Sequence, residues 1–365
     1  MKYNLSDICD YVRGKVDVAS LIYENYISTE NMISNKGGIT SASSLPSVAQ
    51  TQSFQVGDIL VSNIRPYFKK IWFAEFNGGC SNDVLVLRAK DGISKKFLYY
   101  VLTDDTFFNY SMLTSKGTKM PRGDKAAIMK YEVPGFTYKE QEKIAKILEA
   151  FDKKIQLNLN LNDNLEQQAQ AIFKSWFIDY EPFNGKIPST WKEYRLADFF
   201  PVVTGKKNAN VSSDSGQYPF FSCSQNIAWT DNYSFEGNAI LVAGNGDFNV
   251  KWYNGKFEAY QRTYVLIPYN PRYSSWLYYA VKYNLAKITS AARGSVIRFI
   301  TKGNLENFSF LAPRELDKYE IIDTFSTINH AIEQRVQENY RLQVFRDNLL
   351  PRLMTGEIDV SSVKI

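Results

Sequence analysis

The sequence predicts an α+β protein with two globular domains of α/β type in tandem, each followed by a long helix. Two observations lead to this fold class. Residues 139–180 and 316–354 both carry an apolar stripe with heptad spacing, and short signatures of the first globular part return in the second. A helix of about forty residues, roughly 60 Å long, cannot bury such a stripe by itself. We therefore expect the two helices to pair as an antiparallel coiled coil, related by pseudo-twofold symmetry.

The first stripe lies in a stretch that contains neither Gly nor Pro and is rich in good helix formers. Its apolar residues recur in alternating steps of four and three, which places them on one face of a helix. Asn158 and Asn162 fall on the same face and interrupt the stripe with polar side chains. The interface residues predicted for this helix are Ile144, Leu148, Phe151, Ile155, Leu165, Ile172 and Trp176.

The second stripe repeats the first at a constant distance of 177 residues, as between Ile144 and Ile321 or Asn162 and Asn339. A buried Asn between helices can fix their register, although these two could instead face solvent or another subunit. A further alternative is that each stripe packs on its own globular domain. The interface residues predicted for the second helix are Ile321, Phe325, Ile328, Ile332, Leu342, Leu349 and Leu353.

The globular parts are expected at residues 1–138 and, after a linker with two prolines, within 181–315, while 316–365 hold the second helix and a C-terminal tail. Residues 57–62 and 81–87 predict buried strands, and residues 97–102 predict a short helix. The repeat is visible in short matches: Tyr3–Ile8 returns as Tyr194–Phe199, and Gly14–Lys15 as Gly205–Lys206. These matches indicate a tandem duplication of a globule and a helix.

Composition limits the class of protein. A net charge of +5 permits a nucleic-acid partner without requiring one. The three cysteines, Cys9, Cys80 and Cys223, are far apart and are expected to be buried thiols in a reducing compartment. The N-terminus has no apolar signal core, and no apolar run approaches the about 20 residues of a membrane span. We expect a cytoplasmic protein without a membrane partner.

Catalytic motifs are weak. The one histidine, His330, falls between stripe positions and is expected to face solvent. Gly205-Lys206-Lys207 lacks the glycine spacing of a phosphate-binding loop, and Asn270-Pro271-Arg272-Tyr273 only approaches the Asn-Pro-Pro-aromatic motif of amino-methyltransferases. His, Cys and acidic residues do not occur at metal-ligand spacing. The sequence therefore favours a binding protein that is not an enzyme and has no metal site.

The helical segments resemble the central helices of type I restriction–modification specificity subunits. The resemblance rests on Glu140-Gln141-Glu142-Lys143-Ile144-Ala145, on the run from Leu165 to Phe183, and on Leu349-Leu350-Pro351-Arg352-Leu353-Met354-Thr355-Gly356-Glu357-Ile358. It covers the whole architecture, because that family is built from two target-recognition domains separated by two long helices.

The resemblance implies a non-catalytic subunit of a larger enzyme. Each globule would read half of a bipartite site on double-stranded DNA, and the helices would set the spacing between the halves. The helices would also dock two modification methyltransferase subunits, and restriction/translocase subunits would complete the complex. This chain would bind no cofactor itself, since S-adenosylmethionine, ATP and Mg²⁺ would belong to the partner subunits.

Candidate DNA-binding residues are basic or hydroxyl side chains in expected loops, where they can contact phosphates or guanine. In each case a solvated surface charge is the alternative. Tyr67, Phe68 and Trp72 lie near the first group and are expected in the core, the alternative being that they pack on sugars or flipped bases. The candidates are Arg65, Lys69, Lys70, Lys116, Thr118, Lys119 and Arg122 in the first globule, and Lys251, Arg262, Arg293, Ser295 and Arg298 in the second.

Three other functions stay open on the sequence. One is a two-headed scaffold that binds proteins or glycans. Another is an enzyme that uses the Asn270 motif. A third is the specificity subunit of a related combined nuclease–methyltransferase system. Steep salt dependence of binding would favour DNA over the scaffold, because it reports phosphate contacts.

Overall fold

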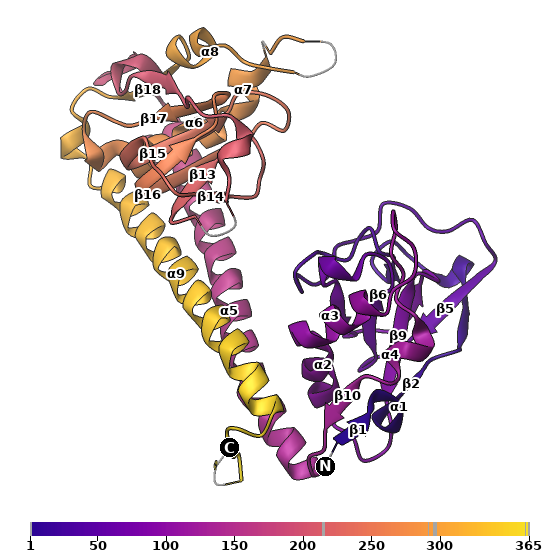
Figure 1. Cartoon of the computed structure of the whole chain (residues 1–365). Coiled ribbons are helices and arrows are strands. Elements are labelled where there is room, and N and C mark those ends of the chain that lie inside the picture. The colour runs from indigo at the N-terminus through magenta and orange to yellow at the C-terminus, as the bar shows by residue number, and fades with distance from the viewer. Residues whose placement is uncertain (1, 214–215, 291, 295–297, 362, 364–365) are drawn as a thin grey trace. The chain divides into compact units, whose positions relative to one another are not determined.

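The computed structural model describes residues 2–213, 216–290, 292–294, 298–361 and 363. The chain forms two compact units, which we call the first unit (Met1–Gln156 with Asn339–Ile365) and the second unit (Leu157–Glu338). Each unit combines one globular part with one end of each long helix (Figure 1).

The first unit contains two four-stranded sheets. One has the order β2-β9-β6-β7 and is antiparallel throughout, with the fully buried strand β6 near its centre. The other has the order β3-β5-β8-β4, in which only β4 and β8 run parallel. The strands are β2 (Cys9–Tyr11), β3 (Lys15–Asp17), β4 (Tyr26–Ile27), β5 (Gln50–Phe54), β6 (Ile59–Ser62), β7 (Ile71–Phe73), β8 (Gly78–Cys80) and β9 (Val84–Ala89).

Both predicted strands begin later than expected: residues 57–58 lie outside β6, which starts at Ile59. The sequence predicted a strand from residue 81, but residues 81–83 form a turn and β9 starts at Val84. The Ser81 hydroxyl accepts the amide of Asp83 at 3.2 Å, and the Ser81 carbonyl accepts the amide of Val84 at 3.0 Å. Serine competes for backbone hydrogen bonds in this way, and so favours turns over strands.

Helices cover the buried side of these strands in the first unit. The central helix, α2, buries Phe97, Leu98, Val101 and Leu102 in the core that also holds Ile59 of β6. Its start is capped by Ser94, whose hydroxyl accepts the amide of Phe97 at 3.4 Å. The helices are α1 (Leu5–Ile8), α2 (Lys95–Thr103), α3 (Asp105–Leu113) and α4 (Lys125–Ile128), and a small ribbon pairs β1 (Lys2–Asn4) with β10 (Glu132–Pro134).

The second unit has one six-stranded sheet in the order β12-β17-β15-β16-β13-β14, in which only β13 and β16 run parallel. A separate ribbon pairs β11 with β18. The elements are β11 (Trp191–Arg195), β12 (Val202–Thr204), β13 (Tyr218–Phe221), β14 (Ala228–Thr230), β15 (Phe235–Ala243), β16 (Val250–Ala259), β17 (Thr263–Leu266), β18 (Ser309–Pro313), α6 (Ser274–Tyr283), α7 (Leu285–Ser290) and α8 (Lys302–Glu306).

The two units contain the same central hairpin. In the second unit, β15 and β16 pair without interruption from Phe235↔Phe257 to Val242↔Val250. In the first unit the equivalent hairpin is split into β5–β8 and β6–β7 by the turn at residues 55–58, where Gly57 adopts φ +89° and Asp58 accepts the amide of Gln55 at 2.8 Å. The predicted duplication is therefore present in strand order as well as in sequence.

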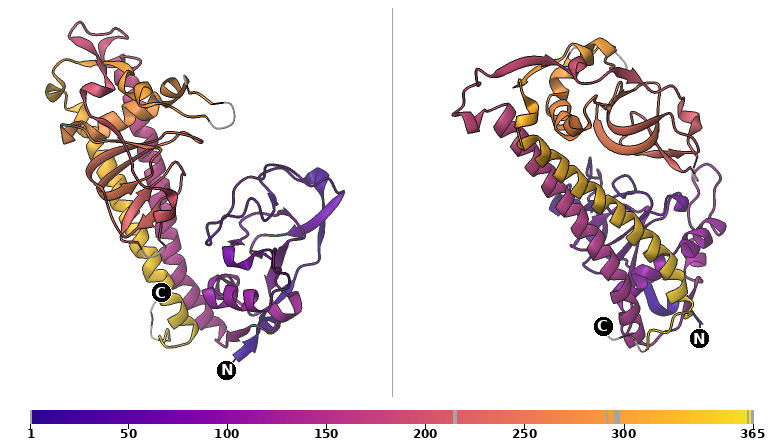
Figure 2. Two further views of the ribbon diagram at one scale, coloured as in Figure 1. Left: turned by 45° about the horizontal axis from the view of Figure 1, so that its top comes forward. Right: turned by 90° about the vertical axis from the view of Figure 1, so that its left-hand side faces the viewer.

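The long helices are α5 (Tyr138–Phe177) and α9 (Ile321–Met354), which lie side by side in both views of Figure 2. In the first unit, the Asn339 amide donates to the Ile155 carbonyl at 3.4 Å. In the second unit, the equivalent Asn162 donates to the Ile332 carbonyl at the same distance. In the first unit Asp152 also contacts Arg346, and in the second unit Phe173 also contacts Phe325. In each unit the residue numbers therefore rise along α5 as they fall along α9, so the helices run antiparallel as predicted. The second helix starts at residue 321 rather than 316, because a short 3₁₀ turn occupies Leu316–Lys318.

The predicted interface residues divide into two groups by burial. Ile144, Leu148, Ile155, Phe325, Ile328 and Leu353 are buried. Phe151, Leu165, Ile172, Trp176, Ile321, Ile332, Leu342 and Leu349 are half-buried. Towards the end of α5 the buried residues are instead Ala169, Phe173 and Phe177, and the rings of Phe173 and Phe177 lie 6.2 and 6.4 Å from the ring of Phe325. Phe177 also lies 5.6 Å from Trp276 of the globular part, so this end of the helix packs on both neighbours.

Candidate nucleic-acid interface

The loop between α3 and α4 forms a narrow hairpin that projects from the first unit. Lys116 and Arg122 exchange backbone hydrogen bonds at 2.9 Å in both directions and close its base. Gly117 adopts φ +91°, a conformation that favours glycine, and thereby lets the chain turn. Thr118 and Lys119 lie exposed at the tip.

Backbone hydrogen bonds fix this hairpin to the turn that follows strand β6. The Arg65 amide donates to the Pro121 carbonyl at 2.8 Å, and the Gly123 amide donates to the Asn63 carbonyl at 3.1 Å. Arg65 itself has φ +49° and is half-buried. The base of the hairpin is therefore held against the sheet, while its tip faces solvent.

The second unit builds the same hairpin. Arg293 and Phe299 exchange backbone hydrogen bonds at 2.9 and 2.8 Å, and Gly294 adopts φ +101°. The turn after β15 holds it through the Gly246 amide, which donates to the Arg298 carbonyl at 3.1 Å. Ser295 lies outside the described residues. Because each of these bonds has a counterpart in the first unit, the two hairpins are equivalent parts of the duplication.

The side chains on these equivalent frames differ. In the first unit, Arg122 forms an ion pair with Asp83 at 3.1 Å. The corresponding positions in the second unit hold Phe299 and Arg262. Arg262 matches Asp83 because the carbonyl of each accepts, at 2.8 Å, an amide from the turn after the central strand. One backbone frame therefore presents a paired cation in the first unit and an aromatic ring with an exposed arginine in the second.

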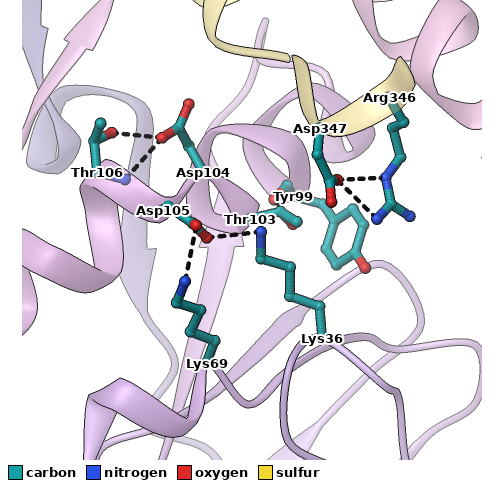
Figure 3. Close-up of polar contacts among 9 residues, drawn as sticks. All are labelled: Lys36, Lys69, Tyr99, Thr103, Asp104, Asp105, Thr106, Arg346 and Asp347. Atoms are coloured by element: carbon teal, nitrogen blue, oxygen red, sulfur yellow. Dashed lines mark hydrogen bonds and ion pairs between the residues drawn. The ribbon is translucent and has the colours of Figure 1, made fainter. Parts of the chain in front are cut away.

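Lys69 and Lys70 are engaged within the first unit. Asp105, at the start of α3, binds Lys69 at 2.8 Å and Lys36 at 2.9 Å (Figure 3). Partial burial raises the pKa of Asp105, but the hydrogen bonds from these lysines outweigh burial, so its pKa lies below the ordinary value. The Lys70 ammonium donates to the Thr29 carbonyl at 2.6 Å, and burial lowers its pKa.

Most other candidate cations also have partners. Lys116 pairs with Asp124 at 2.6 Å, Lys251 donates to the Ser224 carbonyl at 2.7 Å, and Arg298 donates to the Thr289 carbonyl at 3.1 Å. Burial lowers the pKa of Lys251. Among the residues that the structure describes, the exposed candidate cations without a hydrogen bond or ion pair from the side chain are Lys119, Arg262 and Arg293.

Comparison with known proteins assigns the family. A family model described as the type I restriction modification DNA specificity domain matches residues 1–167 and 188–340. The chain belongs to this family. The prediction made from the helical motifs is thereby confirmed, and the two matched segments agree with the duplication.

Relatives agree with this assignment. The specificity subunit of the type I restriction enzyme EcoDI from Escherichia coli is 36% identical over 178 residues, which are 48% of this chain and 40% of that protein. The specificity subunit of type I restriction enzyme MjaIX from Methanocaldococcus jannaschii is 24% identical over 317 residues, covering 75% of this chain and 71% of its own length. The match thus spans less than half of the first relative and about seven tenths of the second.

A solved structure shares the fold. The crystal structure of the type I restriction–modification system S subunit from M. genitalium has a TM-score of 0.62 and 18% identity, covering 97% of this chain and 96% of that chain. The predicted fold of two globular domains with two long helices is confirmed by this likeness.

Two aromatic residues were misplaced by the sequence reasoning. Tyr67 and Phe68 were expected in the core, but they are 47% and 37% exposed, whereas Trp72 is buried as expected. They occupy the 3₁₀ turn Pro66–Phe68, which lies between the left-handed residues Arg65 and Lys69. This backbone points both rings outward beside two cations. Exposed aromatic rings next to cations are suited to pack on sugars or on bases flipped out of a duplex.

Other expectations concern chemistry outside the hairpins. Within the described residues, no group of three or more His, Cys, Asp or Glu side chains is placed to hold a metal ion. No helix among those residues is long and apolar enough to cross a membrane. Cys9 and Cys80 are buried as expected, but Cys223 is half-exposed because it sits in a loop after β13, where its thiol donates to the Arg262 carbonyl. His330 is exposed, as expected.

Proposed function

We propose that this chain is the DNA sequence-specificity subunit of a type I restriction–modification complex, and that each globular part reads one half of a bipartite site on double-stranded DNA. The observation that carries the proposal is the pair of equivalent hairpins with different side chains. A shared backbone frame brings each hairpin to DNA in the same way, and unlike side chains read unlike bases.

The side chains suit this division. Arginine and lysine bind guanine in the major groove, and an aromatic ring can contact the methyl group of thymine. The first hairpin offers Lys119 and Arg122, and the second offers Arg293 with Phe299 and the neighbouring Arg262. Each half-site would therefore be read by side chains of different chemistry. In the first unit, Tyr67 and Phe68 add exposed rings that can pack on sugars or flipped bases.

The long helices would set the spacing of the half-sites and dock two modification methyltransferase subunits. Apolar side chains stay exposed on them in both units: Leu157 (52%) and Leu161 (40%) in the second unit, and Tyr340 (61%) and Phe345 (64%) in the first. Exposed apolar groups of this kind favour a protein partner. Restriction/translocase subunits would join through that complex. S-adenosylmethionine, ATP and Mg²⁺ would be bound by the partners, and the assembly would act on DNA in the cytoplasm.

Methylome sequencing tests the proposal. The chain is expressed with its modification subunit in cells that lack both, and methylated sites are mapped. A bipartite motif with a fixed gap should appear only when both are present. A stable complex that methylates no new motif would argue against the proposal and in favour of the scaffold.

Single substitutions test which unit reads which half of the motif. Arg262→Ala should change only one half of the motif, and Arg122→Ala only the other half. The matched control is Lys139→Ala, which removes an exposed charge at the start of α5 and should leave the motif unchanged. A change in both halves by either arginine variant would contradict separate reading by the two units.

A further inference from the structure

A groove in the first unit carries cations that the candidate interface does not include. It has a volume of about 600 Å³ and lies at the end of strand β2, beside α4. Arg13, Lys15 and Lys125 line it, together with Tyr11, Gln52 and Met129. No aspartate or glutamate of the described residues is among its lining side chains. The lining side chains therefore carry three positive charges and no negative charge, and the nearby Asp124 is paired with Lys116 at 2.6 Å.

Hydrogen bonds fix the backbone around the groove, and so fix the positions from which the three cationic side chains extend. The Val12 amide donates to Val86 at 2.9 Å, and the Gly14 carbonyl accepts the amide of Ser53 at 3.0 Å. The Tyr11 hydroxyl donates to the Lys125 carbonyl at 3.1 Å and ties α4 to the strand end. The three cationic side chains are exposed and form no hydrogen bond or ion pair among the described residues.

Two of these three cations recur in the second unit. Tyr11 pairs with Leu87 in the first unit as Val202 pairs with Leu266 in the second, so Tyr11 and Val202 are equivalent. Four residues further along each chain segment, Lys15 therefore corresponds to Lys206. The spacing of the hairpins aligns Lys125 with Lys302. Lys206 is exposed with no side-chain partner among the described residues, whereas Lys302 pairs with Glu306 at 3.2 Å.

The comparison between units separates two kinds of contact. Both half-sites of a DNA duplex share the phosphate backbone and differ in their bases. Side chains that the duplication keeps should therefore contact phosphates, and side chains that it changes should contact bases. Lys15 with Lys206, and Lys125 with Lys302, belong to the first kind. Arg122 with Phe299 belongs to the second kind.

We propose that Lys15 and Lys125 in this groove, and Lys206 and Lys302 at the equivalent positions of the second unit, form sequence-independent binding surfaces for the DNA phosphate backbone, one in each unit. This inference rests on the proposed function and adds to it a surface outside the recognition hairpins. Each lysine removes one condensed counterion when it binds a phosphate, so each contributes about 0.9 to the slope of log affinity against log salt.

The test uses the complex of the full chain with its modification subunits and measures binding to a cognate duplex and to an unrelated duplex between about 50 and 200 mM salt. Lys15→Ala/Lys125→Ala should lower the slope by about 2, and should weaken both duplexes by about fivefold per contact near 0.15 M salt. The methylated motif should stay the same. Lys206→Ala should have a larger effect than Lys302→Ala, because Lys302 already pairs with Glu306.

Charge removal alone is controlled by Lys139→Ala/Lys146→Ala, which takes two exposed lysines of the first unit that lie outside the groove and, among the described residues, form no side-chain hydrogen bond or ion pair. This control should keep the slope of the unmutated complex. An unchanged slope in Lys15→Ala/Lys125→Ala would overturn the inference, and so would a slope lowered equally by the control. A changed motif would also overturn it, because it would reveal base contacts. If the unmutated complex binds no DNA, the proposed function fails and the inference fails with it.

Discussion

Asp152 in α5 offers a sharp test of how the globular part of the first unit is anchored to the long helices. Its carboxylate accepts the Tyr100 hydroxyl at 2.6 Å and the Arg346 guanidinium at 2.6 Å, and so joins α2, α5 and α9 within the first unit. The side chains of Asp152 and Arg346 are 32% and 20% exposed, and Tyr100 is buried. We expect Asp152→Ala to loosen all three helices at this point.

The magnitude follows from the two bonds. A hydrogen bond to a charged group contributes about 1.5–3 kcal/mol, and partial exposure places both bonds near the lower end, for a loss of about 3 kcal/mol. Arg346 keeps a second partner, Asp347, at 2.8 Å, which limits the loss. The equilibrium for local opening should then shift by about a hundredfold.

The second unit supplies a natural comparison. There, the equivalent Tyr279 hydroxyl contacts the neutral Asn329 at 3.0 Å and the carboxylate of Glu166 at 3.2 Å. Asp152→Asn places the same neutral side chain beside Tyr100 and should keep the tyrosine bond while losing the ion pair. It should therefore cost less than Asp152→Ala, at about 1–2 kcal/mol.

Hydrogen exchange of backbone amides is the suitable assay, because a chain with two units does not unfold in one step. Protection of α2 should fall about a hundredfold in Asp152→Ala, while protection of α6 in the second unit should stay unchanged. Equal protection of α2 in the variant and the unmutated chain would refute the anchoring role. Equal losses in Asp152→Asn and Asp152→Ala would show that the tyrosine bond contributes nothing.

Three further predictions follow from single contacts. The pKa of Asp105 is lower in the folded than in the unfolded chain, so its ionised carboxylate stabilises the fold at pH values above the unfolded pKa of about 3.9. This contribution is lost as the pH falls through the folded pKa, and Asp105→Asn should abolish that loss of unfolding free energy in denaturation curves measured over acidic pH. Gly117→Ala places a side chain at φ +91° and should weaken reading of one half-site only, whereas Gly294→Ala should affect the other, as mapped by methylome sequencing. Phe173→Ala should destabilise the second unit by about 3–5 kcal/mol in chemical denaturation, against little change for the exposed Leu161→Ala.

The helices were the most predictable part of the fold. Heptad spacing and the absence of Gly and Pro located α5 to within a few residues, and the repeat at 177 residues predicted its antiparallel partner. The stripe could not reveal that Phe173 and Phe177 are buried near the end of α5. That burial depends on rings from the globular part, such as Trp276, which are distant in sequence.

The candidate interface was less predictable. Glycine and basic residues indicated the loop around Gly117, but charge alone could not show that Lys69 and Lys70 have partners inside the fold. Those partners, Asp105 and Thr29, come from elements brought close only by folding. The exposure of Tyr67 and Phe68 depends on the left-handed backbone conformation of Arg65 and Lys69. The sequence could not indicate this conformation, because neither residue is a glycine.

The division of the helices between the units has a consequence for synthesis. The second unit is one continuous stretch, Leu157–Glu338, and holds all of its core once residue 338 has left the ribosome. The first unit lacks Leu350, Leu353 and Met354, which belong to its core, until the last part of α9 has been made. The domain translated first is therefore completed last, and its apolar surface stays uncovered while the second unit is being produced. A nascent chain in this interval is the species most dependent on chaperones and most exposed to proteases.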